Sequence, residues 1–484
     1  MFRTSDTGNP ARSVAQFLSD RFRCPGDVAD FVVSGDLSDS SGYFRLGSDI
    51  LYGQCSSGTP AARATDPLHD AHEYVISDGS MVRLPFDPAQ VVDNLRSERY
   101  QGTSAGVKTL PGYSSFRRMY YLIRPMLAVS ARKHLQRLYF RDWDKIPFPM
   151  APVDRTVESI FERLLIYSMR SQKVERVPFI WFWPNGSPSC TMITHDVETS
   201  AGRDFCPQLM DLNDSVGIKS SFQIVPEKRY AVSASVLDGI RKRGFEINVH
   251  DLNHDGRLIC NREEFLHRAE RINHYGRRFG ALGFRSAVMY RNIDWYDALD
   301  FSYDMSIPNV AHLDPQQGGC CTVLPFFIGN ILELPLTTTQ DYSLFNILND
   351  YSIRLWKEQI ALIRQKHGLI SFIVHPDYII DQAARRVYAE LLQYLSVLRS
   401  NGETWIALPG EVAAWWRLRS ELKLVNVEGA WRIEGQGSER ARIAYAVIVN
   451  DALSYELAPP SGAAGGAFRA PLDSWEISAG RARR

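Results

Sequence analysis

The chain has 484 residues, of which 45% are hydrophobic and 23% charged, and this composition excludes a wholly disordered protein. Lysine plus arginine and aspartate plus glutamate each number 55, so no basic excess indicates a nucleic-acid partner. No apolar stretch approaches the roughly 20 residues of a membrane helix. The first residues also lack the apolar core of a secretory signal. We therefore expect a cytoplasmic protein with no transmembrane segment.

Residues 1–187 are predicted to form an N-terminal accessory region. Within it, residues 1–110 are rich in serine, aspartate and glycine and have few long periodic runs. Apolar residues at helical spacing predict a helix over Val157–Arg170. The seven cysteines of the chain lie at scattered positions without a C-x-x-C pair, which indicates free thiols.

From about residue 188 onward, short apolar runs alternate with helical stretches, the pattern of a parallel sheet or barrel. The eight predicted strands are Cys190–Thr194, Ser221–Val225, Phe245–Val249, Gly283–Ser286, Ser302–Met305, Ile331–Leu336, Leu369–Val374 and Thr404–Leu408. About eight strands within ~220 residues fit a (β/α) barrel, complete or distorted. The predicted fold class is therefore α/β, with a distorted (β/α) barrel over residues 188–418.

Beyond the barrel the apolar period falls to two, which predicts a small antiparallel β appendage over residues 419–458. Its four expected strands are Leu422–Val427, Ala430–Glu434, Ala441–Val449 and Ala452–Leu457. Residues 459–484 are rich in proline, glycine, alanine and arginine and are predicted to form a flexible tail.

Ionisable residues follow five of the predicted barrel strands. In a parallel barrel the reactive groups lie at the carboxyl ends of the strands, because the loops that build the site begin there. These residues are Asp196 and Glu198 after the first strand, His250 and His254 after the third, Arg285 on the fourth, Asp304 on the fifth and His375 after the seventh.

The spacing of these residues indicates metal-assisted hydrolysis. Asp196 and Glu198 are two apart on a strand and share a face, where two carboxylates repel unless a cation or proton lies between them. Two imidazoles, from His250 and His254, and one carboxylate are a common ligand set for a catalytic divalent metal. The second carboxylate is then free to deprotonate water, with an arginine to orient it and a further histidine to protonate the leaving group.

At these residues the sequence resembles the family 4 carbohydrate esterases, which are polysaccharide deacetylases with a distorted (β/α) barrel and include the nodulation-type chitooligosaccharide deacetylases. The resemblance covers about residues 188–415. Five family motifs occur in the family's order, the first in the form of a branch in which one residue separates the two acids. They correspond to Thr194–Glu198, His250 with His254, Arg285, Asp304 and Ile373–His375.

The resemblance implies a role for each matched residue. Asp196 would be the general base, oriented by Arg285, and His375 would be the general acid, tuned by Asp304. One divalent metal ion, zinc as the first expectation, would be bound by Glu198, His250 and His254. The implied reaction is hydrolysis of an acetyl group on an N-acetylated sugar or glycan precursor, a carbohydrate partner for the site.

Two departures from the family pattern leave alternatives. Val197 stands where the family has a second acid, so either Glu198 binds the metal in its place, or Asp196 binds it and no base remains; we expect the former. Arg285 is followed by Ser-Ala-Val, without the proline of a loop that helps to stabilise the oxyanion in the family. The alternatives are a hydrolase of the same barrel acting on another C–N bond, in a cyclic amide or formyl group, or a non-catalytic carbohydrate-binding barrel.

Overall fold

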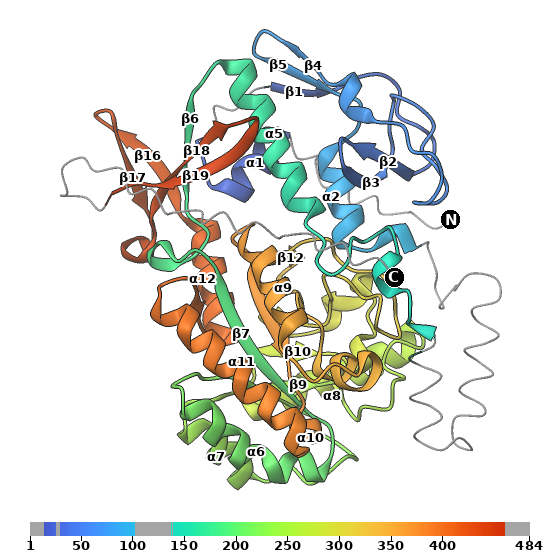
Figure 1. The fold of residues 1–484 in the computed structure, drawn as a ribbon, viewed down its shortest axis with the longest axis vertical. Helices are drawn as coiled ribbons and strands as arrows, with labels where there is room; N and C mark the ends of the chain where they lie inside the picture. The colour runs from blue at the N-terminus through green and yellow to red at the C-terminus, as the bar shows by residue number, and fades with distance from the viewer. Residues whose placement is uncertain (1–13, 26–29, 102–136, 138, 460–484) are drawn as a thin grey trace, which may run out of the picture.

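The structure is a computed structural model that describes residues 14–25, 30–101, 137 and 139–459. Figure 1 shows the barrel strands and their helices in one half of the molecule, with the N-terminal elements and the last β-hairpins together at the end where β7 begins. The tail predicted over residues 459–484 lies, except for its first residue, outside the described residues.

The described part of the N-terminal region is built from short strands and three helices. Asp87 caps α2 through the amides of Ala89 and Gln90, so this helix begins where a capping aspartate precedes a proline. The predicted helix over Val157–Arg170 is confirmed as α5. The elements are α1 (Val14–Phe22), β1 (Asp30–Val33), β2 (Gly42–Leu46), β3 (Asp49–Gly53), β4 (Ile76–Asp78), β5 (Met81–Leu84), α2 (Pro88–Arg96), α5 (Thr156–Gln172) and β6 (Arg176–Ile180).

A curled sheet confirms the predicted fold class of a distorted (β/α) barrel. Its strand order is β12-β13-β11-β10-β9-β8-β7-β14, parallel except for the antiparallel pair β12–β13. The short β15 pairs with the first residues of β7. The strands are β7 (Cys190–Val197), β8 (Ser221–Ile224), β9 (Glu246–His250), β10 (Gly283–Arg285), β11 (Tyr303–Asp304), β12 (Phe326–Ile328), β13 (Ile331–Glu333), β14 (Leu369–Ile373) and β15 (Trp405–Ile406).

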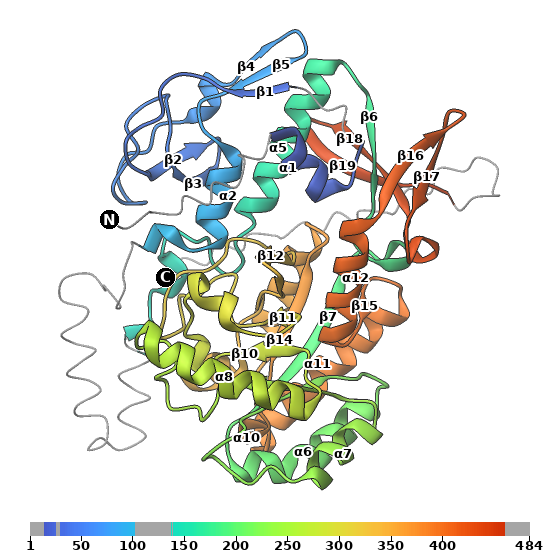
Figure 2. The same cartoon turned by 180° about the vertical axis from the view of Figure 1, so that it is seen from behind.

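All eight predicted barrel strands are present, with ends that differ by up to three residues. Among the strands of this sheet, only the short β12 was not predicted. Helices cover the outside of the sheet, as Figure 1 shows for α8 beside β9, and Figure 2 shows α8 from the other side. They are α6 (Ser200–Asp214), α7 (Ala234–Lys242), α8 (Arg262–Phe279), α9 (Arg354–Arg364), α10 (Pro376–Ile379), α11 (Gln382–Ser400) and α12 (Pro409–Glu421).

Side chains rather than a strand ladder join the segment after β13 to β14. The Thr337 hydroxyl donates to the Leu369 carbonyl at 2.7 Å and accepts the Ser371 amide at 3.0 Å. The Thr338 hydroxyl donates to the Ser371 carbonyl at 2.7 Å. This threonine seam continues the barrel wall where backbone pairing stops, which accounts for the distortion of the barrel.

The four strands expected after the barrel are present as two hairpins, β16 (Lys423–Val427) with β17 (Ala430–Glu434) and β18 (Ile443–Val449) with β19 (Ala452–Leu457). The second hairpin also pairs with β6, antiparallel, with Ala444 opposite Phe179. Segments before and after the barrel therefore share one sheet.

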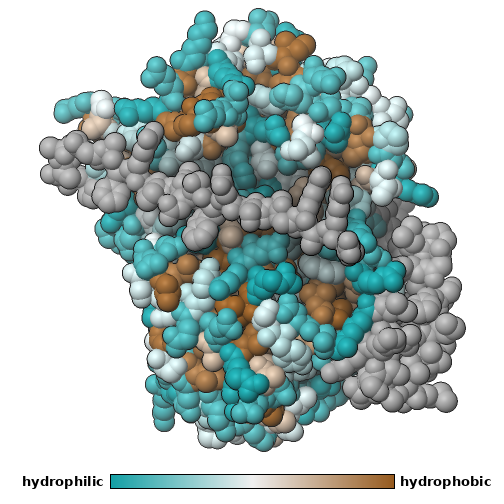
Figure 3. Space-filling view, in the orientation of Figure 1, coloured by the Kyte–Doolittle hydropathy of each residue, from teal (hydrophilic) through white to brown (hydrophobic). Residues whose placement is uncertain are grey.

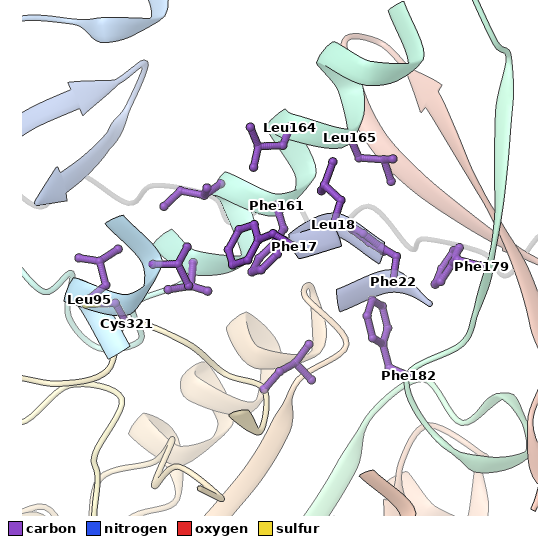
Figure 4. Packing of buried hydrophobic residues seen from close by; sticks show 14 of the residues in the cluster. Phe17, Leu18, Phe22, Leu95, Phe161, Leu164, Leu165, Phe179, Phe182 and Cys321 are labelled. Carbon is purple, nitrogen blue, oxygen red and sulfur yellow. The ribbon is translucent and has the colours of Figure 1, made fainter. Parts of the chain in front are cut away.

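The core under the N-terminal elements is aromatic. Figure 4 shows Phe17 and Phe22 of α1 directed toward Phe161 of α5 and toward Phe179 and Phe182. The rings of Phe17 and Phe161 are stacked with centroids 4.4 Å apart. Because these side chains are 9% exposed or less, α1 and α5 are held mainly by apolar burial.

Hydrophilic residues predominate on the face drawn in Figure 3, where apolar side chains lie in separate small groups. Among the described helices, none combines the length and the apolar character needed to cross a membrane. All seven cysteines are free thiols, and six of them are buried.

Candidate functional site

Three parallel strands, β7, β9 and β10, and the turn after β14 bring predicted residues to one edge of the sheet, with β8 between β7 and β9. Asp196 is the penultimate residue of β7, His250 ends β9 and Arg285 ends β10. His375 lies just after β14 and caps α10. Parallel pairing places these strand ends side by side, since Arg285 is in register with His250. The convergence follows from topology and requires no unusual backbone on the strands themselves.

Glu198, His250 and His254 form a group whose ligand atoms all lie within 4.8 Å of one another. Glu198 Oε1 lies 2.9 Å from His254 Nε2, and the two imidazole rings have centroids 4.9 Å apart. His254 reaches this position because Asp251 and His254 itself adopt left-handed backbone conformations, with φ of 54° and 53°. Burial with positive φ at residues other than glycine stores strain, which is a frequent feature of functional sites.

The state of His250 suits a metal ligand. Its Nδ1 lies 3.2 Å from the Arg285 carbonyl, so Nδ1 carries the proton and donates it there. Its Nε2 is buried and has no hydrogen-bond partner among the described residues. Burial lowers the pKa of His250 to about 4, which leaves the ring neutral at physiological pH. A neutral, oriented imidazole with a free lone pair, together with a second histidine and a carboxylate, fits a divalent metal ion.

Glu198 is ionised in spite of its burial. Burial alone would raise the pKa of its carboxyl, but hydrogen bonds with His254 and His375 outweigh that effect and hold the pKa well below its ordinary value. The side chain is 20% exposed and that of His254 is 10% exposed, whereas Asp196, His250 and His375 are at 5% or less. Solvent therefore reaches the site on the side of Glu198 and His254.

Arg285 holds Asp196 beside the triad of candidate metal ligands, Glu198, His250 and His254. One guanidinium nitrogen of Arg285 donates to Asp196 Oδ1 at 2.7 Å and to the Thr194 hydroxyl at 2.7 Å. Burial would raise the pKa of Asp196, but Arg285 and His250 keep it below the ordinary value. Asp196 Oδ2 lies 3.7 Å from His250 Nε2, so this carboxylate faces the triad with one oxygen and Arg285 with the other.

Asp341 holds His375, and sequence reasoning missed it. Its carboxylate accepts the His375 amide at 2.7 Å and lies 2.6 Å from His375 Nδ1. Burial would lower the pKa of His375, but Asp341 and Glu198 raise it well above its ordinary value. His375 Nε2 points to Glu198 Oε1 at 3.5 Å. The imidazole is therefore a charged group with one nitrogen fixed and the other directed at the triad.

The position of Asp304 corrects the expectation that it tunes His375. Asp304 accepts hydrogen bonds from the amide and the hydroxyl of Ser306, at 2.9 Å and 2.7 Å. It stands in register with Glu333, and burial raises the pKa of both carboxyls. The only signal for Asp341 in the sequence is an acid some residues after the sixth predicted strand, in a segment without periodicity.

His195, the neighbour of Asp196, points to the opposite face of β7, as expected of a packed histidine. It is fully buried, and its Nδ1 lies 2.8 Å from the Val374 carbonyl. Burial lowers its pKa to about 4, so the ring is neutral and ties β7 to the residue before His375.

Comparisons with known proteins give only distant likenesses. No protein-family model matches the sequence, and no curated protein matches it. Among solved structures, a Mycobacterium smegmatis protein assigned to the polysaccharide deacetylases is 15% identical with a TM-score of 0.41, over 51% of this chain and 97% of that chain. A Pseudomonas aeruginosa PAO1 protein with the same assignment is 13% identical with a TM-score of 0.37, over 48% and 91%. The Puue allantoinase is 13% identical with a TM-score of 0.37, over 49% and 92%. At these values the likenesses assign neither a family nor an activity.

Proposed function

We propose that this chain is a metal-dependent hydrolase, a divergent member of the family 4 carbohydrate esterases, that removes the acetyl group from an N-acetylated sugar or glycan precursor. The observation that supports it most is that the ligand atoms of Glu198, His250 and His254 lie close together, next to two further groups. These are a carboxylate held by an arginine and an imidazolium held by an aspartate. This is a base and an acid on two sides of a cation site.

Each residue has one task in this proposal. Glu198, His250 and His254 would hold the ion, zinc as the expected metal, whose chemistry when bound is to polarise a carbonyl oxygen and acidify water. Asp196 takes a proton from the attacking water, because Arg285 keeps it ionised and aimed. His375 gives its proton to the amine nitrogen as the C–N bond breaks, and acetate and the free amine leave.

The first experiment measures bound metal and acetate release together. Wild type and the His250→Ala/His254→Ala variant are loaded with zinc, freed of excess and analysed for metal. The matched control is His267→Ala/His274→Ala, which removes two exposed histidines of α8 outside the site. We expect about one zinc per chain in wild type and control and none in the triad variant.

Acetate release is then assayed on N-acetylglucosamine oligomers, with a cyclic ureide and an N-formyl sugar in the same panel. Release of acetate by wild type and control, and not by the triad variant, supports the proposal. Activity confined to the ureide or formyl compound replaces the deacetylase with a hydrolase of another C–N bond. A protein that binds no metal overturns the proposal and leaves a carbohydrate-binding barrel as the alternative.

A further inference from the structure

Asp377 lies between the two loops that carry the acid and the exposed carboxylate of the site. It is in the first turn of α10, two residues after His375. Its carboxylate faces the start of α6, where Thr199 is the N-cap residue that follows Glu198. Helices α10 and α6 are in direct contact. No role proposed above uses Asp377.

Both carboxylate oxygens of Asp377 are engaged by the turn that bears Glu198. Oδ2 accepts the Glu198 amide at 3.3 Å, and Oδ1 accepts the Thr199 hydroxyl. That hydroxyl in turn accepts the Gly202 amide at 3.2 Å, which caps α6. A carboxylate at this place is also favoured by the positive end of the 15-residue helix α6.

Gly202 leaves the space that Asp377 occupies. A Cβ atom at residue 202 would lie 2.6 Å from Asp377 Cγ and 2.8 Å from its Oδ1, closer than real Cβ contacts. Gly202 lies inside a helix, where glycine is a poor helix former, and its φ is not in the left-handed region. A side chain at residue 202 would therefore have to displace the Asp377 carboxylate.

The peptide unit of Glu198 is held from both sides. Asp377 accepts its amide, and Arg229 Nε donates to its carbonyl at 2.8 Å. Glu198 lies beyond the end of β7, where no strand ladder fixes it, and a glutamate has one more side-chain torsion than an aspartate. A glutamate ligand depends on such support to keep its carboxylate in place.

We infer that Asp377 is a positioning residue that fixes Glu198 as a metal ligand and couples the Glu198 turn to the His375 turn, with Gly202 as the space it requires. The inference rests on the proposed function, because Glu198 needs fixing only if it binds the ion. It predicts that loss of Asp377 weakens metal binding without touching any ligand atom.

The test is the zinc affinity of the full chain, measured by competition with a chelator of known affinity. We expect Asp377→Ala to bind zinc roughly 10–100-fold more weakly than wild type, the usual effect of losing a group that orients a ligand. Asp381→Ala is the matched control, since Asp381 caps the neighbouring helix α11 through Ala383 and Ala384 and does not contact Glu198. Asp377→Asn keeps one acceptor oxygen and is expected to bind more tightly than Asp377→Ala.

Gly202→Ala tests the same contact from the other side. The added methyl group displaces the Asp377 carboxylate, so Gly202→Ala alone should lower the zinc affinity below that of wild type. In a chain that already carries Asp377→Ala, it should lower the affinity no further. Circular dichroism checks the fold of each variant, and if Asp377→Ala does not fold, Asp377→Asn and Gly202→Ala give the answer by the same readout. Unchanged zinc affinity in the folded variants overturns the inference alone, whereas wild type without zinc binding overturns the proposed function and the inference with it.

Discussion

The replacement of Asp341 by asparagine tests a contact with His375 that the structure shows and the sequence motifs did not predict. Asp341 accepts three hydrogen bonds, from the His375 amide at 2.7 Å, from His375 Nδ1 at 2.6 Å and from the Tyr342 amide at 2.8 Å. Asparagine has one carbonyl oxygen, so its amide nitrogen must face at least one N–H group. We therefore expect Asp341→Asn to leave His375 without its charged partner while the shape of the site is kept.

The magnitude follows from the bonds lost. A hydrogen bond to a charged group contributes about 1.5–3 kcal/mol, and a positioned general acid contributes about 10²–10⁴-fold to the rate. The carboxylate also raises the pKa of His375, so its loss makes the imidazolium less populated at neutral pH. We expect kcat to fall by about 10²–10⁴-fold in Asp341→Asn. Zinc content should stay at the wild-type value, since Asp341 is outside the ligand group.

The assay is acetate release from N-acetylglucosamine oligomers, with Asp304→Asn as the control. Asp304 bonds Ser306, whereas His375 bonds Asp341, so the neutral replacement of Asp304 should change kcat by less than about tenfold, provided that the protein folds. A large loss in Asp304→Asn together with near wild-type activity in Asp341→Asn would refute the assignment of the histidine partner.

Three further predictions concern stability and are checked by denaturant unfolding. Arg291 and Glu98 form a buried ion pair between the barrel and the N-terminal region, so Glu98→Gln should lower the free energy of unfolding by about 3–5 kcal/mol, against less than about 1 kcal/mol for Asp300→Asn in an exposed pair. Thr337→Val leaves the Ser371 amide without its acceptor in the seam and should cost about 1–3 kcal/mol; a cost near zero would contradict the role of the seam. Burial lowers the pKa of His367 from 6.5 to about 4. Its contribution to the free energy of unfolding is therefore complete above pH 6.5 and is lost as the pH falls through 4. That contribution is at most about 3 kcal/mol. Asparagine suits the left-handed backbone at residue 367, and the stability of His367→Asn should depend less on pH in this range than that of wild type. Equal pH dependence in both proteins would contradict the lowered pKa of His367.

Local sequence signals predicted most of the barrel. Strands buried on both faces are short apolar runs bounded by turns, and β14 carries this signal most clearly. Helix α11 is equally explicit, since its apolar stripe begins after the capping residue Asp381 and ends near Asn401. The strand β12 was missed although it is apolar, and it pairs antiparallel with β13.

The candidate site likewise contains residues that the sequence predicted and one that only the structure showed. Asp196, Glu198, His250, Arg285 and His375 lie at or next to strand ends. The predicted strands, with the rule that loops follow their carboxyl ends, are therefore enough to predict that these residues lie close together. The role of Asp341 could not be predicted from the sequence, because its position depends on how the segment after β13 crosses to β14. Chain order alone favoured Asp304, which the sheet places beside Glu333 instead.

The sequence by itself determined the properties that depend on local periodicity and residue type: an α/β barrel, the positions of its strands, and a set of ionisable side chains at one rim. Tertiary structure alone decided which groups touch. The threonine seam, the pairing of β18 with β6, the Asp341–His375 pair and the contact of Asp377 with Gly202 join residues far apart in the chain. Such contacts depend on side-chain packing over the whole fold, for which neighbouring residues carry no signal.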